Sequence, residues 1–327
     1  MKAAWYSSFG TAEEVLKIGE FETPEPEAGE VKIRVYASGV NPSDTKKRLG
    51  ANSALLDDGP VIPNSDGAGE IVSVGEGVSP SRIGERVWVY NAQYGRQLGT
   101  SAEYVCLPSD YAIILPESAD YNTGAMMGIP AMTAHRCVFT DGSVADQTLL
   151  ITGGAGRVGY YAIQWAKHHG AAVIATASSA GSREQCKNAG ADLVVDHPSD
   201  DSVREILDYT DGKKIDRIIE GDFGANLLSV LDILKTGGTI ATYSSMTDMN
   251  PSIPFVRMMF MDITIRMVLV YAMPQAAKEQ AARDITTMLS QNRLDNRVAK
   301  EYSLDHIASA HALIESGKAY GSVIIKP

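Results

Sequence analysis

The motif that most constrains the fold is a glycine-rich turn in the middle of the chain. It directly follows the short apolar run Thr148–Ile151, and a segment with the 3.6-residue period of an amphipathic helix follows it. A turn of the pattern G-x-G-x-x-G in this context is typical of a dinucleotide-binding unit, although a purely structural turn is the alternative. Its glycines permit a tight turn, close approach of a pyrophosphate and close packing of the helix. We therefore predict that a dinucleotide contacts Gly153, Gly154, Ala155, Gly156, Arg157, Val158 and Gly159.

From Gln147 onward, short apolar runs alternate with helical patterns. Apolar runs of this kind are typical of parallel strands buried on both faces. Ser202 and Glu205 predict a capping box for a helix through Leu207, and Gly237-Gly238 are expected to close another helix. The alternation predicts a doubly wound parallel sheet of six strands. We place them at residues 148–151, 172–175, 193–195, 215–219, 239–242 and 263–270.

About the first 120 residues have a different pattern. Apolar and polar residues alternate over residues 31–36, the signature of a half-buried strand, and glycines and prolines separate further short runs. This predicts an antiparallel β-rich domain. The tail after about Ala276 is helical and ends in a strand at residues 323–325, which is expected to return to that domain. A chain of 327 residues favours two domains, here residues 1–126 with 273–327, and residues 127–272.

Composition narrows the ligand to a small molecule. The formal net charge of −11 is spread along the chain, and no Lys/Arg-rich stripe is present, which disfavours nucleic acid and anionic membranes as partners. No apolar run suits a secretory signal or a membrane span. The three cysteines lie far apart in the sequence, which is typical of a reducing compartment. We expect a cytoplasmic protein.

The end of the second predicted strand indicates which dinucleotide is bound. Domains that prefer NAD end this strand in a carboxylate that binds the ribose 2′-hydroxyl. Here Ser178 and Ser179 follow the strand, and Arg183 comes shortly after them. Small hydroxyls and a guanidinium suit a 2′-phosphate, so we predict NADPH. Helix capping by the serines and a solvated surface charge at Arg183 are the alternatives.

Several motifs in order resemble the zinc-independent, zeta-crystallin-like quinone oxidoreductase group of the medium-chain dehydrogenase/reductase superfamily. The resemblance covers essentially the whole chain and implies a GroES-like catalytic domain, a Rossmann domain and a homodimer. The apolar run at residues 263–270, which would be an exposed edge strand in a monomer, also favours a dimer. The motifs are residues 39–44 (GVNPSD), 66–72 (DGAGEIV), 84–87 (GERV), 99–104 (GTSAEY) and 152–159 (TGGAGRVG).

The same comparison argues against a catalytic zinc. Zinc-dependent relatives have a cysteine where this chain has Asn41, and a His-Glu pair where it has Ser65-Asp66. Catalytic zinc needs three protein ligands with nitrogen, sulfur or carboxylate donors, and asparagine and serine are not among them. The four-cysteine structural lobe is also missing, since residues 90–100 contain no cysteine. We therefore expect no metal.

The resemblance further implies roles for individual residues. Asn41 and Asp44 match positions near the nicotinamide and the substrate, although an ion pair of Asp44 with Lys47 or Arg48 is the alternative. Thr133 matches a threonine near the nicotinamide ribose, or else it is a helix-core residue. His197, which ends the third strand near the adenosine, could contact the 2′-phosphate, or else it is a polar loop residue. The end of the fifth strand should line the nicotinamide side through Tyr243, Ser244 and Ser245.

The expected reaction is direct hydride transfer from NADPH to a quinone or another conjugated carbonyl. Such acceptors are already electron-poor and need no Lewis acid, and proximity in a dry cleft would supply most of the catalysis. Many quinone reductases have an aromatic residue near the substrate shortly after the position of Arg48-Leu49-Gly50, but this chain has Ala51 there, so a tyrosine proton donor is absent at this place. Tyr90 or Tyr94 could take its role, or else these tyrosines only pack. The alternatives are an enal or enone reductase, and an NADPH-binding protein with little turnover. RNA binding is disfavoured by the acidic charge.

Overall fold

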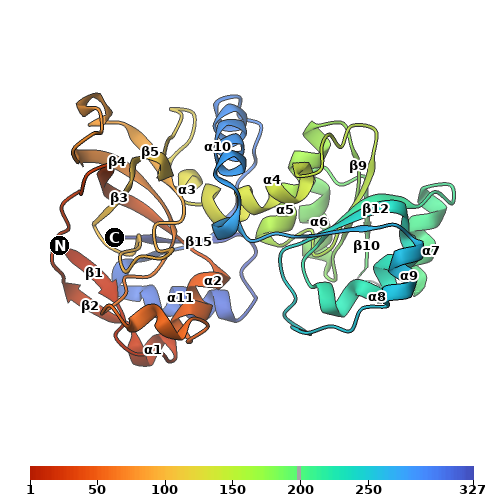
Figure 1. The fold of residues 1–327 in the computed structure, drawn as a ribbon, viewed down its shortest axis with the longest axis horizontal. Helices are drawn as coiled ribbons and strands as arrows, with labels where there is room; N and C mark the ends of the chain where they lie inside the picture. The colour runs from red at the N-terminus through yellow and green to blue at the C-terminus, as the bar shows by residue number, and fades with distance from the viewer. Residues whose placement is uncertain (197–199) are drawn as a thin grey trace. The chain divides into compact units, whose positions relative to one another are not determined.

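The computed structural model describes residues 1–196 and 200–327, and these form two compact units (Figure 1). The β-rich unit comprises Met1–Ile129 and Ala282–Pro327, and the α/β unit comprises Pro130–Ala281. The expected domain boundaries fall after residues 126 and 272, whereas the two compact units divide after Ile129 and Ala281. No helix in the described part of the chain is long and apolar enough to cross a membrane.

The α/β unit contains a parallel sheet in the strand order β10-β9-β8-β11-β12-β13. The prediction of a doubly wound sheet with six parallel strands is therefore confirmed. The direction in which strands are added reverses between β8 and β11, and such sheets bind ligands at the carboxyl ends of the strands at this point. The strands are β8 (Thr148–Ile151), β9 (Ala172–Thr176), β10 (Leu193–Val195), β11 (Ile215–Glu220), β12 (Leu234–Thr242) and β13 (Thr264–Met267).

Helices connect these strands. Buried apolar residues of α8, such as Leu227 and Leu231, pack with Ile218 of β11 in a core cluster of this unit. Trp165 on α5 is also fully buried. The helices are α4 (Met132–Phe139), α5 (Arg157–His168), α6 (Ala180–Asn188), α7 (Asp200–Tyr209), α8 (Phe223–Ile233) and α9 (Phe255–Phe260), with the short η5 (Val270–Ala272). Two more cross the unit boundaries, η4 (Met127–Ala131) and α10 (Gln275–Ser290).

Two predicted helix ends are wrong. α7 begins at Asp200, so Ser202 lies inside the helix, buried beside Leu150 and Thr176, and does not cap it. α8 ends at Ile233 and β12 begins at the next residue, so Gly237-Gly238 lie within a strand. Gly237 has a φ of 74°, and the pairing of β12 with β11 is irregular just there, which glycine accommodates.

The β-rich unit is built on the long strand β3 (Glu30–Val40), which pairs antiparallel with three other strands. One of these is the C-terminal strand β15, where Ile324 lies opposite Gly39, so the tail returns to this unit. The other strands are β1 (Lys2–Trp5), β2 (Lys17–Glu20), β4 (Asp66–Val74), β5 (Arg86–Val89), β6 (Tyr104–Pro108), β7 (Ala112–Ile114), β14 (Val298–Ser303) and β15 (Ser322–Lys326).

Short helices complete the β-rich unit and position its polar residues. Asn41 immediately follows β3 and caps α2, so the end of the strand fixes where this helix begins. The α-helices are α1 (Ala12–Val15), α2 (Pro42–Arg48), α3 (Tyr121–Gly124) and α11 (Ile307–Glu315). The 3-10 helices are η1 (Ser53–Leu56), η2 (Pro80–Arg82), η3 (Ser109–Tyr111) and η6 (Leu304–His306).

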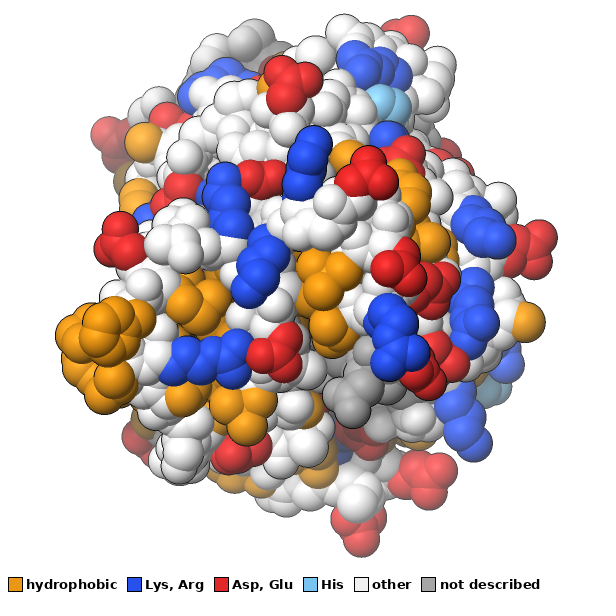
Figure 2. All heavy atoms as spheres, turned by 90° about the vertical axis from the view of Figure 1, so that its right-hand side faces the viewer, with side chains coloured by type: hydrophobic (Ala, Val, Ile, Leu, Met, Phe, Trp, Pro, Cys, Tyr) orange, Lys and Arg blue, Asp and Glu red, His pale blue; other side chains and the backbone are white. Residues whose placement is uncertain are grey.

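The face of the molecule shown in Figure 2 carries charged side chains of both signs, with apolar side chains gathered toward one edge. On the α/β unit the exposed large apolar residues concentrate around α9 and β13. They include Ile253, Phe255, Val256, Met259, Phe260, Met267 and Leu269.

Candidate functional site

The glycine-rich turn adopts the geometry that its sequence predicts. Its start is fixed to β9, because the N–H of Gly153 donates to Thr176 Oγ1 and that of Gly154 to the Thr176 carbonyl, both at 3.0 Å. A Cβ added at Gly154 would lie 2.8 Å from Ala175 Cβ, and one at Gly159 would lie 2.6 Å from the Gly153 carbonyl oxygen. Both positions therefore exclude side chains because the helix lies close to the sheet.

The outer side of the turn is open to a ligand. A Cβ at Gly153 would have no neighbour within 4 Å, and one at Gly156 would meet only the Gly153 carbonyl, at 3.1 Å. Gly156 is the N-cap of α5, whose first turn contains no acidic residue. The N–H groups at the start of a helix point along its axis, and together with the positive end of the helix dipole they suit a phosphate at this position. The turn thus fits a pyrophosphate on structural grounds.

The residues predicted to bind the 2′-phosphate have partners of their own. Ser179 caps α6 by accepting a hydrogen bond from the N–H of Ser182 at 3.1 Å, so its capping role is confirmed. Arg183 Nη2 donates to Asp196 Oδ2 at 2.8 Å, a pairing that local sequence patterns do not show. Ser178 is exposed. His197 lies outside the described residues, and its predicted role stays a prediction.

An acidic residue that the sequence analysis missed lies beside the turn. Glu220 ends β11 and is fully buried, and its Oε1 accepts a hydrogen bond of 2.9 Å from the hydroxyl of Thr152, the residue before Gly153. The sequence contains one sign of this residue's importance, because an acidic residue directly follows the apolar pair Ile218-Ile219 at the end of a predicted strand. Burial raises the pKa of Glu220 above its usual range.

Tyr243, Ser244 and Ser245 follow β12 and lie against the start of α8. The Ser244 carbonyl accepts from the N–H of Phe223 at 2.9 Å, and Ser245 Oγ accepts from the N–H of Gly224 at 2.9 Å. Burial raises the pKa of Tyr243, so its hydroxyl stays neutral. Thr133 is buried within α4. For these four residues, contact with the cofactor stays a prediction.

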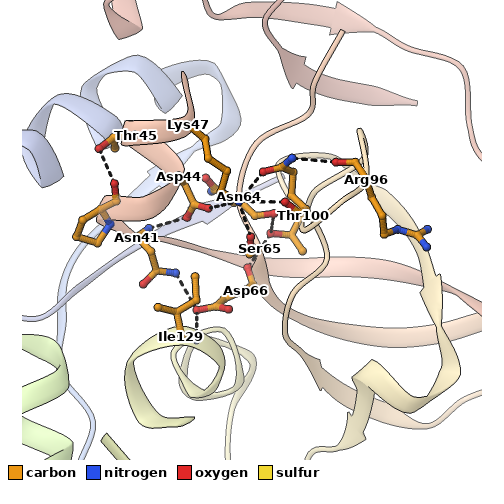
Figure 3. A network of polar contacts seen from close by, with 12 residues as sticks. Asn41, Asp44, Thr45, Lys47, Asn64, Ser65, Asp66, Arg96, Thr100 and Ile129 are labelled. Atoms are coloured by element: carbon orange, nitrogen blue, oxygen red, sulfur yellow. Dashed lines mark hydrogen bonds and ion pairs between the residues drawn. The ribbon is translucent and has the colours of Figure 1, made fainter. Parts of the chain in front are cut away.

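In the β-rich unit the structure brings Asn41 and Asp44 together within a buried polar network (Figure 3). The Asn41 N–H donates to Asp44 Oδ2 at 2.8 Å, which caps α2. The Asn41 side-chain amide donates to Asp66 Oδ2 at 2.8 Å, and that oxygen also accepts the N–H of Ile129 at 2.8 Å. A Cβ at Gly128 would lie 2.0 Å from Asp66 Oδ1, so this position must lack a side chain.

The ammonium of Lys47 lies inside the same network. Its Nζ donates to Gln93 Oε1 at 2.6 Å and to Ser65 Oγ at 3.2 Å, and lies 3.8 Å from Asp44 Oδ1. Burial lowers the pKa of Lys47, while the charges of Asp44 and Asp66 raise it. The alternative for Asp44, an ion pair with Lys47, is thus present in the structure.

The remaining candidates are Arg48, Tyr90 and Tyr94, and their surroundings differ from those of Lys47. Arg48 is fully buried and pairs with Glu315 of α11, so it is not the partner of Asp44. Tyr90 is buried between the rings of Trp88 and Tyr111, which confirms its packing role. The Tyr94 side chain is half exposed.

Comparisons with known proteins agree with this geometry. Residues 27–117 match the family model of the alcohol dehydrogenase GroES-like domain, and residues 158–287 match that of zinc-binding dehydrogenases. The quinone oxidoreductase of Rattus norvegicus is 31% identical, covering 99% of this chain and 97% of that protein. A 2-methylene-furan-3-one reductase of Solanum lycopersicum is 26% identical, covering 100% of this chain and 79% of the relative. A solved mycobacterial protein in complex with NADPH superposes with a TM-score of 0.89 at 26% identity, and each chain is covered completely.

The GroES-like and Rossmann folds, with the glycine turn between β8 and α5, define a medium-chain dehydrogenase/reductase. Within that superfamily, the chain belongs to the zeta-crystallin-like quinone oxidoreductase group.

The pairing of Arg183 with Asp196 leads to a test of cofactor preference. We expect Asp196→Asn to tighten NADPH binding by roughly threefold to tenfold, because it removes a negative charge beside the position predicted for the 2′-phosphate. Arg183→Gln should weaken NADPH binding about tenfold. Both variants should leave the Kd of NADH nearly unchanged in fluorescence titrations. Asp201→Asn, in an exposed pair with Arg204, is the matched control. Equal effects on NADPH and NADH would contradict this assignment.

Proposed function

We propose that this chain is an NADPH-dependent, zinc-independent oxidoreductase that reduces quinones or other conjugated carbonyls. The observation that carries the proposal is the glycine turn, whose backbone is open to a pyrophosphate at the carboxyl end of β8. The polar network around Asn41 and Lys47 supports the absence of zinc. Membership of the quinone oxidoreductase group supports the acceptor class.

The chain's own residues would bind and orient the reactants. NADPH supplies a hydride when it is bound, and one further proton, for which water is a sufficient source, completes reduction of a quinone to a quinol. The N–H groups of the turn and α5 would hold the pyrophosphate, and Arg183 the 2′-phosphate. Asn41 is held rigidly by Asp66 and Asp44, so its amide could steady negative charge on the acceptor oxygen.

Zinc independence is supported by the chemistry of the side chains at the relevant positions. Asn41 and Ser65 offer neutral oxygen donors, and the Lys47 ammonium hydrogen-bonds to Ser65. A divalent ion beside that ammonium would meet strong repulsion in a buried environment. Within the described residues, no group of three His, Cys, Asp or Glu side chains could hold a metal.

We therefore expect purified enzyme to contain less than about 0.1 zinc per chain by elemental analysis, and its turnover to survive prolonged treatment with a chelator. Lys47→Met should lower stability, because Asp44 and Asp66 lose their buried counter-charge, by about 3 kcal/mol in denaturant unfolding. Lys187→Met, on α6, is the matched control. Stoichiometric zinc, or turnover lost on chelation and restored by zinc, would refute this part of the proposal.

The acceptor class can be tested by following NADPH oxidation with panels of quinones and enones. Turnover with quinones should exceed that with simple enones, while the reductase of Solanum lycopersicum makes enone reduction the second candidate. Asn41→Ala should lower kcat/KM about a hundredfold with little change in the Kd of NADPH, because it removes a donor to developing negative charge. Asn52→Ala, at an exposed position, is the control. Tight NADPH binding without turnover in either panel would instead favour a non-catalytic binding protein.

A homodimer is the second part of the proposal. β13 is the last strand of its sheet and pairs with β12 alone among the described strands, and exposed Met267 and Leu269 lie on or just after it. The exposed apolar residues of α9, Phe255 and Phe260 among them, add to this surface, and Figure 2 shows apolar side chains gathered toward one edge. Pairing of two such edges would cover both.

We expect sedimentation at micromolar concentration to show a dimer, and the double substitution Met267→Glu with Leu269→Glu to give monomers, because charges would be buried at the joined edges. Ile114→Glu places one such charge on an exposed apolar position of β7 and should leave the dimer intact. A wild-type chain that sediments only as a monomer would rule out the dimer.

A further inference from the structure

Glu220 occupies an unusual position for an acidic side chain. It ends β11, next to β8 and the glycine turn, and its side chain is fully buried. Its Oε1 accepts three hydrogen bonds, from the Thr152 hydroxyl at 2.9 Å, the Asp222 N–H at 2.6 Å and the Asn226 side-chain amide at 2.8 Å. Its Oε2 is buried with no hydrogen-bond partner among the described residues.

These contacts join three segments that surround the cofactor turn. Thr152 directly precedes Gly153, and its hydroxyl also accepts the N–H of Gly221 at 2.9 Å. Asp222 caps α8, and Asn226 lies within that helix. One carboxyl group therefore connects the end of β8, the end of β11 and the start of α8, and fixes the position from which the turn begins.

The surroundings of Glu220 favour its neutral form. The titratable groups that face it are Asp222, at the start of α8, and Tyr243, after β12. Neither is a cation. Burial, the largest effect, and the charge of Asp222 raise the pKa of Glu220, while the hydrogen bonds from Asp222, Asn226 and Thr152 lower it, and the net direction is upward. An ionised carboxylate would leave charge on an oxygen without a partner, which is costly in a buried site.

We propose that Glu220 is a positioning residue for the dinucleotide, which holds the glycine turn as a neutral acid and weakens cofactor binding when it loses its proton. The inference rests on the proposed binding of the cofactor at this turn. Loss of the proton would place a negative charge behind a site that has to accept the pyrophosphate, which is itself negative. In the low dielectric of the interior, the two charges would repel strongly.

The direction of the pH dependence follows from the coupling between proton loss by Glu220 and binding of the cofactor. A bound pyrophosphate disfavours ionisation of Glu220, so the pKa of Glu220 is higher in the complex than in the free protein. Affinity is therefore greatest below the pKa of Glu220 in the free protein and falls as the pH rises through it. A residue that merely filled space would give no such dependence.

The test is a titration of the Kd from about pH 5, near the ordinary range of a carboxyl group, up to about pH 9 with NADH, which has no 2′-phosphate to titrate, and with NADPH in parallel. For wild-type protein we expect the Kd of NADH to rise on the order of tenfold as Glu220 loses its proton. Glu220→Gln keeps the shape and the acceptor oxygen but cannot ionise, so its Kd should change less than about twofold. Asp232→Asn removes an exposed acid of α8 that pairs with Arg257, and should keep the wild-type profile.

A second variant keeps the inference testable if Glu220→Gln folds poorly. Burial is the main cause of the raised pKa of Glu220, and Asp222→Asn removes a charge that adds to it, so the fall in affinity should move to lower pH. A flat wild-type profile, or an unchanged slope in Glu220→Gln, would overturn the inference while leaving the proposed function intact. Failure to bind either dinucleotide at every pH would overturn the proposed function and the inference together.

Discussion

The close approach of α5 to the parallel sheet is the constraint on which the α/β unit depends. Because Gly154 and Gly159 have no side chains, the helix begins directly against β9 and the turn. Two hydrogen bonds from the turn to Thr176 then fix the backbone, and the Glu220 network fixes Thr152 from the other side. On the other side of the turn, a Cβ at Gly153 would have no neighbour within 4 Å, so this face is open.

The sequence was sufficient to predict those features that depend on local residue patterns. The six strands of the α/β unit follow from short apolar runs, and the roles of the glycines follow from their spacing. The errors concern the ends of elements. Ser202 resembled a cap only because the pattern S-x-x-E is local, whereas burial against the sheet places it inside α7.

Long-range partners explain what the sequence could not show in the candidate site. Arg183 pairs with Asp196, thirteen residues away on the next strand's end, and Arg48 pairs with Glu315 at the far end of the chain. Glu220 was missed because an acid at the end of a strand is unremarkable until its burial is known. The cytoplasmic location stays a prediction.

The two units treat buried charge in opposite ways. In the β-rich unit, the ammonium of Lys47 is a counter-charge for Asp44 and Asp66, and replacing Lys47 by an uncharged residue would remove it. In the α/β unit, Glu220 has only neutral donors and another acid beside it. A cation there would favour the ionised form of Glu220, close to the turn at which we propose that the pyrophosphate binds. An acidic side chain thus pairs with a buried cation in one unit, whereas in the other it accepts hydrogen bonds from neutral donors, because of what lies within reach of its oxygens.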